Sequence, residues 1–239
     1  MIARENIELL TRKYQTDVIT VWREYFQHLF LSYFYQQEHA DKIFFKGGTA
    51  LRLLYKSPRF SEDIDFSSTL QEVFSIETIV IATLAEIARE RIQVDIKDAT
   101  PTTGGYLAVL VFKNNGDTMP IRLEISLRTN KNIGQFSTVS GDFLPPYTVF
   151  QLTEQQLVNE KIAALLSRQK PRDFYDTYFL LRNNMISEKN SELLQKILAL
   201  VQQTTIRFDN ELKRYLPKSH WMIIRDFKQT LEREIKRYV

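Results

Sequence analysis

The chain has 239 residues, of which 44% are hydrophobic, with only 7 glycines and 7 prolines. This composition is typical of a folded protein with one large core or two small ones, and it excludes a disordered chain. The net charge of +3 says little about partners by itself. The lack of cysteine excludes disulfides and thiolate zinc sites, and His28, His39 and His220 show no metal-ligand spacing.

The N-terminal stretch has a helical pattern. From Ile2 to about Gln37, apolar residues recur at three- and four-residue steps, which predicts amphipathic helices that cover a sheet. The stretch carries acidic residues and lacks the apolar core of a signal peptide. No run in the sequence approaches the roughly 18 apolar residues of a membrane helix. We therefore expect a cytoplasmic protein with no membrane partner.

Residues 42–66 are the most informative stretch of the chain. An apolar run at 42–45 predicts a short strand, and Gly47 and Gly48 end it where a tight backbone turn is needed. We expect Thr49 to be the N-cap of the helix that follows, so that free backbone amides and the positive helix end face the turn. A phosphate suits that position.

The run that ends this stretch, SEDIDF, has the alternation of a strand. Asp63 and Asp65 share one face, roughly 6.6 Å apart along the strand, and Ile64 and Phe66 share the other. Two carboxylates repel each other unless a cation lies between or beside them, and hard oxygen ligands favour Mg²⁺ or Mn²⁺ over zinc. The alternative is a solvent-facing strand with two acids, because short motifs often match by chance.

The string KGGTALRLLYKSPRFSEDIDFS resembles the signature of the polymerase-beta-like nucleotidyltransferase superfamily: a glycine pair with Ser or Thr, a spacer, then Asp-x-Asp. Within that superfamily it is most similar to the AbiEii-type toxins of bacterial type IV toxin–antitoxin systems. The similarity continues in NEKIAALLSRQKPRDFYDTYFLL, so its motifs span residues 44–181. The spacer after Thr49 is longer than the shortest in the family, and Thr stands where many members have Ser. Neither departure removes a functional group.

The resemblance implies roles for the residues of this stretch. Asp63 and Asp65 would be catalytic and would hold Mg²⁺ or Mn²⁺, with an NTP as substrate. The resemblance also raises phosphorylation of Thr49, which the sequence does not decide. The nucleotide phosphates would be bound by Lys46, Gly47, Gly48, Thr49 and Arg59.

The middle of the chain predicts a helix at 76–91, a strand at 93–96, and a hairpin of two strands at 106–113 and 120–128 joined by NNGDTM. In the second hairpin strand, Glu124 lies on the polar face between arginines. One interpretation is a cross-strand ion pair. The resemblance implies another, because many superfamily members have a third acid beside the Asp-x-Asp strand, which makes Glu124 a candidate metal ligand.

Residues 129–150 contain two glycines and a Pro-Pro pair with little periodicity, so we expect a loop that ends near Tyr147. The predicted domains are therefore 1–147, with the sheet, and 148–239, which is helical. Helical periodicity in the second domain predicts segments at 153–168, 172–183, 188–203 and 205–238, the last with a break at Pro217.

Lys161 lies on one helical stripe with Leu157 and Leu165, and Arg168 continues that stripe. A lysine there either snorkels past apolar neighbours or has an inward-facing role. The resemblance implies that Lys161 faces the nucleotide and neutralises the triphosphate or the leaving pyrophosphate. Arg168 is then a candidate nucleotide-binding residue.

Two acids follow Pro171, which suits the first position of a helix. Asp173 in the first turn would stabilise the helix N-terminus and is also a candidate nucleotide-binding residue. Asp176 has no such local role, although a pair with Arg172 is open to it. The resemblance covers both acids, and we rank Asp176 above Asp173 as the catalytic one.

The C-terminal 35 residues are basic, with five acids interleaved. This stretch is either a site for a polyanion or an ordinary solvated helix face. Its cations are Arg207, Lys213, Arg214, Lys218, Arg225, Lys228, Arg233, Lys236 and Arg237.

Together these features predict an α+β fold, a mixed nucleotidyltransferase sheet flanked by helices and followed by a C-terminal helical bundle. The resemblance implies a metal-dependent nucleotidyltransferase toxin that acts on RNA, at the 3′ end of tRNA, releases pyrophosphate and has an antitoxin protein as partner. Two alternatives stay open. The same fold transfers a nucleotide to a protein or small molecule, or it is an inactive member that only binds a nucleotide or a partner.

Overall fold

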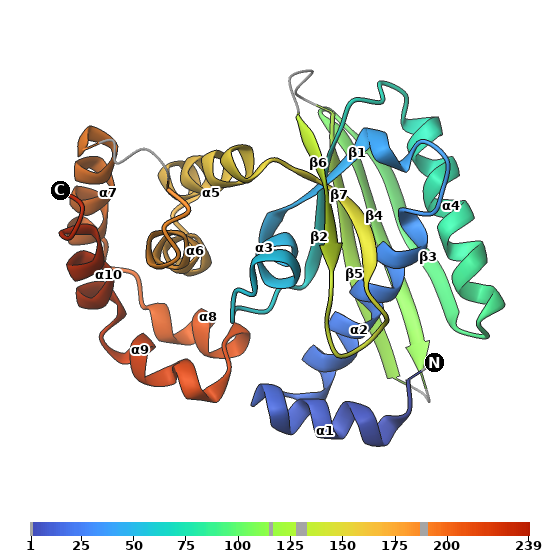
Figure 1. The fold of residues 1–239 in the computed structure, drawn as a ribbon, viewed down its shortest axis with the longest axis horizontal. Helices are drawn as coiled ribbons and strands as arrows, with labels where there is room; N and C mark the ends of the chain where they lie inside the picture. The colour runs from blue at the N-terminus through green and yellow to red at the C-terminus, as the bar shows by residue number, and fades with distance from the viewer. Residues whose placement is uncertain (1, 115–116, 128–132, 187–190) are drawn as a thin grey trace. The chain divides into compact units, whose positions relative to one another are not determined.

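A computed structural model describes residues 2–114, 117–127, 133–186 and 191–239. The chain forms two compact units, Met1–Thr153 and Glu154–Val239 (Figure 1). The first unit contains a mixed sheet with helices, and the second is helical. The predicted α+β class is therefore confirmed.

The described part of the first unit contains a seven-stranded sheet in the order β3-β4-β5-β2-β1-β7-β6. It is mixed, because β1 pairs parallel with β7 and β2 pairs parallel with β5, whereas the other neighbours are antiparallel. The central position of β1 and β2 places both motif strands inside the sheet. The strands are β1 (Ile43–Lys46), β2 (Asp63–Ser68), β3 (Gln93–Thr102), β4 (Gly105–Asn114), β5 (Asp117–Ser126), β6 (Gly134–Val139) and β7 (Tyr147–Leu152).

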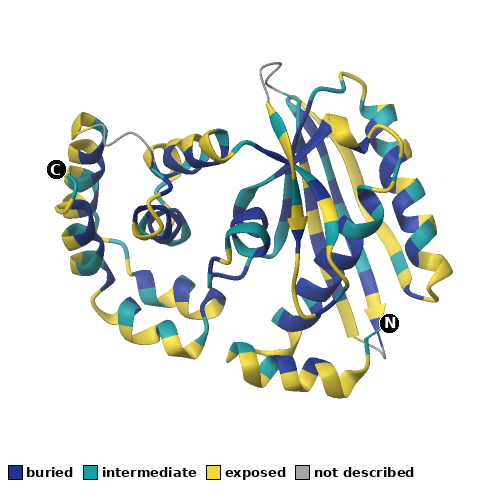
Figure 2. Cartoon of the chain, viewed as in Figure 1, coloured by how far each residue is buried: buried dark blue, intermediate teal, exposed yellow. Residues whose placement is uncertain are grey.

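Helices cover both faces of this sheet. α2 (Val18–Phe34) and α4 (Val73–Arg89) pack on one face, where the ring of Phe26 stacks on Phe112 with centroids 4.5 Å apart. α3 (Gly47–Tyr55) contacts β1 and β2, and α1 (Arg4–Tyr14) packs on α2. Figure 2 shows the buried residues gathered along the sheet and on the inner sides of α2 and α4. A 3₁₀ turn, η1 (Ala40–Lys42), leads into β1.

The edge strands differ most from the sequence-based expectation. β3 continues to Thr102, well beyond the predicted strand. Nearly all its residues are exposed, so the sequence shows no alternation of apolar and polar residues that would have revealed the full length of the strand. The loop expected at 129–150 contains β6 and the start of β7 among its described residues. That expectation was wrong because β6 is held by its backbone ladder to β7 and is largely exposed on both faces. Arg128 and part of the hairpin turn lie outside the described residues.

The first unit continues past the expected boundary at Tyr147. That residue begins β7, which pairs with β1 and β6 inside the sheet, so the compact unit ends at Thr153 instead. The two prolines directly before β7 are typical of a linker, but the strand that follows them belongs to the sheet.

The second unit has the expected helical segments. The break at Pro217 is confirmed, and a second break at Asp226 divides what the sequence suggested was one helix. The elements are α5 (Glu154–Arg168), α6 (Pro171–Arg182), α7 (Ser191–Gln203), α8 (Phe208–Tyr215), η2 (Lys218–His220), α9 (Trp221–Arg225) and α10 (Phe227–Ile235).

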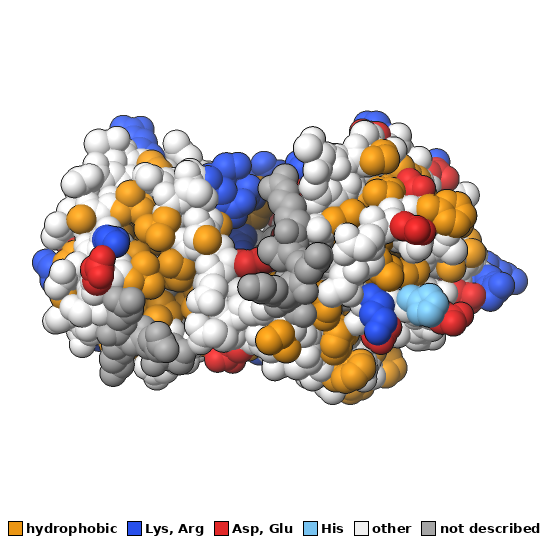
Figure 3. All heavy atoms as spheres, turned by 90° about the horizontal axis from the view of Figure 1, so that it is seen from above, with side chains coloured by type: hydrophobic (Ala, Val, Ile, Leu, Met, Phe, Trp, Pro, Cys, Tyr) orange, Lys and Arg blue, Asp and Glu red, His pale blue; other side chains and the backbone are white. Residues whose placement is uncertain are grey.

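The described ranges contain no helix with the length and apolar character needed to span a bilayer. On the face drawn in Figure 3, hydrophobic side chains are exposed between charged ones of both signs. Exposed large hydrophobics occur in both units, Phe74 and Ile81 on α4 and Met222 on α9 among them.

Candidate active site

The glycine pair lies where strand β1 passes directly into helix α3. Gly47 has a φ of +84°, in the left-handed region that glycine adopts without strain. A Cβ atom on Gly47 would lie 2.1 Å from Oδ2 of Asp65. Glycine is therefore required for two reasons, the backbone conformation and the carboxylate of β2 that lies against it.

Gly48 allows a cation to approach the same junction. A Cβ atom on Gly48 would lie 2.5 Å from Nη2 of Arg59 and 2.9 Å from Oγ of Ser61. The Arg59 side chain is buried, and its Nη1 donates a hydrogen bond to the carbonyl of Phe60 at 2.9 Å. A guanidinium and a carboxylate thus lie at the first turn of α3, where backbone N–H groups lack intrahelical partners and the helix dipole is positive.

The sheet register brings the charged residues of three strands into one row. Asp65 of β2 lies opposite Lys46 of β1 on one side and opposite Glu124 of β5 on the other. Asp63 lies opposite Arg122 in the same parallel pairing. Paired residues of neighbouring strands point to the same face. The row therefore lies on the face of the sheet that meets the start of α3, because the Asp65 carboxylate contacts Gly47 there.

The apolar residues of β2 point the other way, as the alternation predicts. Ile64 and Phe66 are fully buried, and Phe66 stacks on Phe34 of α2 with centroids 5.1 Å apart. Asp63 and Asp65 are only partly buried. The burial of two apolar side chains on α2 thus fixes the register of β2 and holds both carboxylates on the opposite face.

The acidic residues of this face match a divalent cation in type. Within the described ranges, no three His, Cys, Asp or Glu side chains converge closely enough to form a metal site by themselves. Magnesium needs only one or two protein carboxylates when substrate phosphates and water complete its coordination. Asp63 and Asp65 fit that requirement. Glu124, about half exposed, accepts a hydrogen bond from Arg122 at 3.3 Å, so the ion pair suggested by the sequence lies within one strand instead of across two.

Thr49 has a structural contact that the sequence did not suggest. It is fully buried, and its hydroxyl donates a hydrogen bond to the main-chain carbonyl of Asp63. The expectation that Thr49 caps α3 was wrong, because the helix begins at Gly47 and Lys46 occupies the N-cap position. The sequence missed this because glycine usually ends a strand in a turn, whereas here the chain enters the helix directly. Thr49 therefore joins α3 to β2.

The segment between α3 and β2 is held from two sides. Nε2 of Gln27, on α2, donates to the carbonyl of Ser61 at 3.0 Å, and Arg23 of the same helix pairs with Glu62 at 3.2 Å. Arg52 of α3 donates to the carbonyl of Ser57 at 3.1 Å and lies 3.9 Å above the ring of Phe60. These contacts fix the approach of the chain to Asp63. The position of the carboxylates is thus determined before any ligand binds.

Two residues of this region were not singled out from the sequence. Arg122 lies beside Asp63 in the sheet register, and Ser61 lies beside Gly48. The signal for Ser61 was its position two residues before Asp63. Arg122 had no local signal, because only the parallel pairing of β2 with β5 brings it next to that aspartate.

A polar cavity of about 250 Å³ lies elsewhere in the first unit, lined in part by His28, Tyr14, Arg52 and Asp142. Burial lowers the pKa of His28 to about 3, and its Nδ1 lies 2.9 Å from the hydroxyl of Tyr147. Hydrogen bonds from Lys13 and Tyr14 lower the pKa of Asp142.

In the second unit, Lys161 and Asp176 form a buried ion pair. Nζ of Lys161 donates to Oδ2 of Asp176 at 2.8 Å, and the side chains are 9% and 1% exposed. The pair joins α5 to α6. Arg172 pairs instead with Glu211, at 3.7 Å. The predicted roles of Lys161 and Asp176 toward a nucleotide stay predictions, and in this structure the two charges neutralise each other.

Arg168 and Asp173 form a second pair between the same helices. Nε and Nη2 of Arg168 both donate to the Asp173 carboxylate, the shortest contact being 2.7 Å. Asp173 also accepts a hydrogen bond from the backbone N–H of Lys170 at 3.0 Å, which closes a capping box at the start of α6. The expected stabilisation of the helix N-terminus by Asp173 is confirmed.

Comparisons with known proteins were made on the whole chain. A search of curated proteins gave no match. The crystal structure of JHP933 from Helicobacter pylori resembles the chain with a TM-score of 0.56 and 17% identity, over 93% of this chain and 95% of that one. A crystal structure of a proposed nucleotidyltransferase from H. pylori gives 0.49 and 16%, over 100% and 99%. The first of these supports the fold alone.

The family comparison covers both units. The profile of the nucleotidyl transferase AbiEii toxins of type IV toxin–antitoxin systems matches residues 29–237, which include the glycine junction, the Asp-x-Asp strand and both ion pairs of the second unit. We conclude that the chain belongs to the AbiEii family of nucleotidyltransferase toxins.

Proposed function

We propose that this toxin transfers a nucleotide from an NTP to an RNA acceptor, the 3′ end of a tRNA, and releases pyrophosphate. The observation that carries the proposal is the Asp65 carboxylate against Gly47 at the start of α3. The first turn of α3 is a site for an anionic phosphate, yet the Asp65 carboxylate beside it repels phosphate. A divalent cation resolves that conflict, which supports Mg²⁺ or Mn²⁺ dependence.

In this proposal Asp63 and Asp65 hold the metal ions, and Glu124 shares one of them from the neighbouring strand. Bound there, such ions supply a lower pKa for the attacking hydroxyl and neutralise charge on the attacking and leaving oxygens. The parallel pairing of β2 and β5 supports the role of Glu124, because it lies directly opposite Asp65. Its ion pair with Arg122, at 3.3 Å, lies along the same strand.

The phosphates of the NTP are bound at the glycine junction. Backbone N–H groups of the first turn of α3 donate to phosphate oxygens, which Gly47 and Gly48 leave accessible. Arg59 contributes positive charge beside Gly48, and Lys46 contributes it beside Asp65. These groups orient the alpha phosphorus for in-line attack and stabilise the negative charge that moves to the leaving pyrophosphate.

Purified protein incubated with total cellular RNA, Mg²⁺ and each alpha-labelled NTP tests this proposal. We expect label on a tRNA-sized band with one nucleotide. Asp63→Asn or Asp65→Asn should lower the rate by at least about 100-fold, as for the loss of a group that stabilises transition-state charge. Asp98→Asn is the matched control, because Asp98 is an exposed carboxylate on β3 of the same sheet.

Omission of the metal separates the remaining hypotheses. Transfer that survives chelation of divalent cations would contradict the proposed role of both aspartates. Bound NTP without label on RNA would favour a protein or small-molecule acceptor, and an unchanged biological effect of Asp65→Asn would indicate an inactive binding protein.

The membership in a type IV toxin–antitoxin family also implies an antitoxin as partner. We propose that this partner restrains nucleotide transfer. Co-expression of the cognate antitoxin should restore growth without changing the mass of the toxin if restraint is by binding. Covalent modification would instead add mass to the peptide that contains Thr49.

A further inference from the structure

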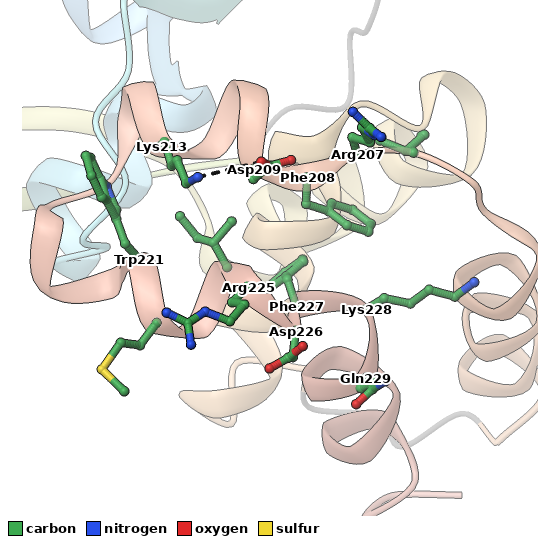
Figure 4. A pocket seen from close by; sticks show the side chains of 13 residues that line it. Arg207, Phe208, Asp209, Lys213, Trp221, Arg225, Asp226, Phe227, Lys228 and Gln229 are labelled. Atoms are coloured by element: carbon green, nitrogen blue, oxygen red, sulfur yellow. Dashed lines mark ion pairs between the residues drawn. The ribbon is translucent and has the colours of Figure 1, made fainter.

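The second unit contains a pocket of about 630 Å³ that no residue of the proposed active site lines (Figure 4). It is formed by α8, α9, the start of α10 and the residues that lead into α8. A volume of this size is typical of sites for small molecules or single nucleotide units. All of its lining residues belong to the second unit.

The lining of this pocket is cationic. Arg207, Lys213, Arg225 and Lys228 face two acids, Asp209 and Asp226, which gives a formal charge of +2. Both lysines are engaged: Nζ of Lys213 lies 3.6 Å from Asp209, and Nζ of Lys228 donates to backbone carbonyls at 2.8 and 3.0 Å.

The two arginines differ from the lysines. Arg207 and Arg225 are exposed, and within the described residues neither side chain has a hydrogen bond or an ion pair. Figure 4 shows both side chains among the pocket-lining residues, Arg225 on α9 and Arg207 beside Phe208. A guanidinium binds a phosphate with two parallel hydrogen bonds, so both are suited to a phosphodiester.

Trp221 provides an aromatic face in the same pocket as these cations. Its side chain is 39% exposed, although tryptophan usually buries most of its surface. Its Nε1 donates to the carbonyl of Leu216 at 3.3 Å, which orients the indole ring. Arg225 lies four residues later on the same side of α9, and the buried Phe208 and Phe227 support the pocket with ring centroids 5.1 Å apart.

We propose that this pocket binds single-stranded nucleic acid, with Trp221 stacked on a base and with Arg207 and Arg225 on its phosphates. An oriented aromatic face beside unpaired cations is the combination that single-strand binding proteins use. An acidic peptide would use the arginines but not the indole face, and a duplex keeps its bases stacked internally. The inference rests on the proposed function in one respect, which is that the acceptor is RNA.

Binding of a fluorescent single-stranded oligoribonucleotide to the full-length protein, without NTP or metal, tests the arginines. Anisotropy titrations at several salt concentrations give the slope of log K against log salt concentration, which is negative. In Arg207→Gln/Arg225→Gln the magnitude of this slope should decrease by about 1.4, because each phosphate that is no longer neutralised accounts for about 0.7. The matched control is Arg12→Gln/Arg91→Gln, which removes two exposed arginines of the first unit. An equal change in both double variants would overturn the proposal.

Substitutions at Trp221 test stacking separately from charge. Trp221→Leu should weaken binding by about 5- to 150-fold, whereas Trp221→Phe, which keeps an aromatic face but not the bond to Leu216, should retain most of it. The fluorescence of wild-type protein should be quenched by the oligonucleotide, and that quenching should be lost in Trp221→Phe, which leaves only the buried Trp22. Equal affinities of Trp221→Leu and wild type contradict stacking.

The same titration distinguishes this inference from the proposed chemistry. Asp65→Asn should bind the oligonucleotide with wild-type affinity while it loses nucleotide transfer, so a protein without transfer activity still reports on the pocket. Displacement of the oligonucleotide by a polyglutamate peptide at equal charge concentration, or preference for duplex RNA, would show that the occupant is not a single strand and would overturn the proposal.

Discussion

At the scale of single residues, Gly47 links backbone conformation to the position of a carboxylate. The positive φ and the contact with Asp65 act on the same atom, because both restrict a Cβ at this position. Gly47→Ala should lower the free energy of unfolding by about 1–3 kcal/mol and displace Asp65, so that nucleotide transfer falls together with stability.

Chemical denaturation and transfer assays on two alanine variants test this expectation. Gly141→Ala is the control, because a Cβ there would meet the His28 ring only at 3.4 Å, an ordinary contact distance. If Gly47→Ala retained both stability and transfer, the role assigned to the junction would be incorrect.

His28 gives the protein a predictable response to acid. Its pKa is about 3 in the folded protein and near 6.5 when exposed, so between these values the unfolded chain binds one proton more than the folded chain. Stability therefore falls as pH decreases below 6.5. At pH 5 the loss from this one group amounts to about 2 kcal/mol relative to neutral pH.

Replacement of His28 by Asn should remove this loss. Asn places a polar atom near the position of Nδ1, where Tyr147 makes its hydrogen bond. Urea unfolding at pH 7.5 and pH 5 should show a decrease in wild type that exceeds the decrease in His28→Asn by about 2 kcal/mol. Equal decreases would show that His28 is protonated in the folded protein at pH 5.

At the scale of elements, the ion pairs between α5 and α6 determine how the second unit is built. Breaking one partner of a buried pair leaves an uncompensated charge, so Lys161→Met alone should destabilise the protein by about 3–5 kcal/mol. Lys161→Met/Asp176→Leu replaces both charges by apolar groups and should recover most of that stability.

Activity of the double variant decides the role of Lys161. Recovery of stability together with transfer would mean that Lys161 holds α5 against α6 and nothing more. Recovery of stability without transfer would support the role toward the triphosphate that the family resemblance implies. Chemical denaturation and initial-rate measurements on the two single variants and the double variant complete the cycle.

The sequence predicted the strands and helix of the candidate site well, for a physical reason. A period of two residues separates Asp63 and Asp65 from Ile64 and Phe66 wherever that strand lies in a sheet. The contact between Thr49 and Asp63, the register of Arg122 beside Asp63 and the partner of Lys161 all depend on how separate elements pack. Local patterns carry no information about such pairings.

At the scale of the whole molecule, charge is divided between the two units. Glu154–Val239 contains 16 Lys and Arg against 11 Asp and Glu, whereas Met1–Thr153 contains 16 against 18. The proposed metal site therefore belongs to a slightly acidic unit and the proposed nucleic-acid pocket to a basic one. The small net charge of the full chain conceals this division, so composition alone gave no reason to expect a polyanion.

The expected domain boundary differed from the observed one because of backbone pairing. Prolines and glycines after the hairpin suggested a linker before Tyr147, but β7 completes the sheet through main-chain pairing with β1 and β6. The edge strand β6, which pairs with β7, is largely exposed, so its side chains left little trace of this backbone ladder in the sequence.

The buried hydroxyl of Thr49 has a consequence for regulation. No kinase can reach that oxygen while α3 is docked on β2, so phosphorylation would proceed only through molecules in which this contact has opened. Its rate would then measure how often β2 separates from α3. A phosphate group attached in that interval would prevent the contact from re-forming, and the toxin would be trapped in a conformation without its aligned carboxylates.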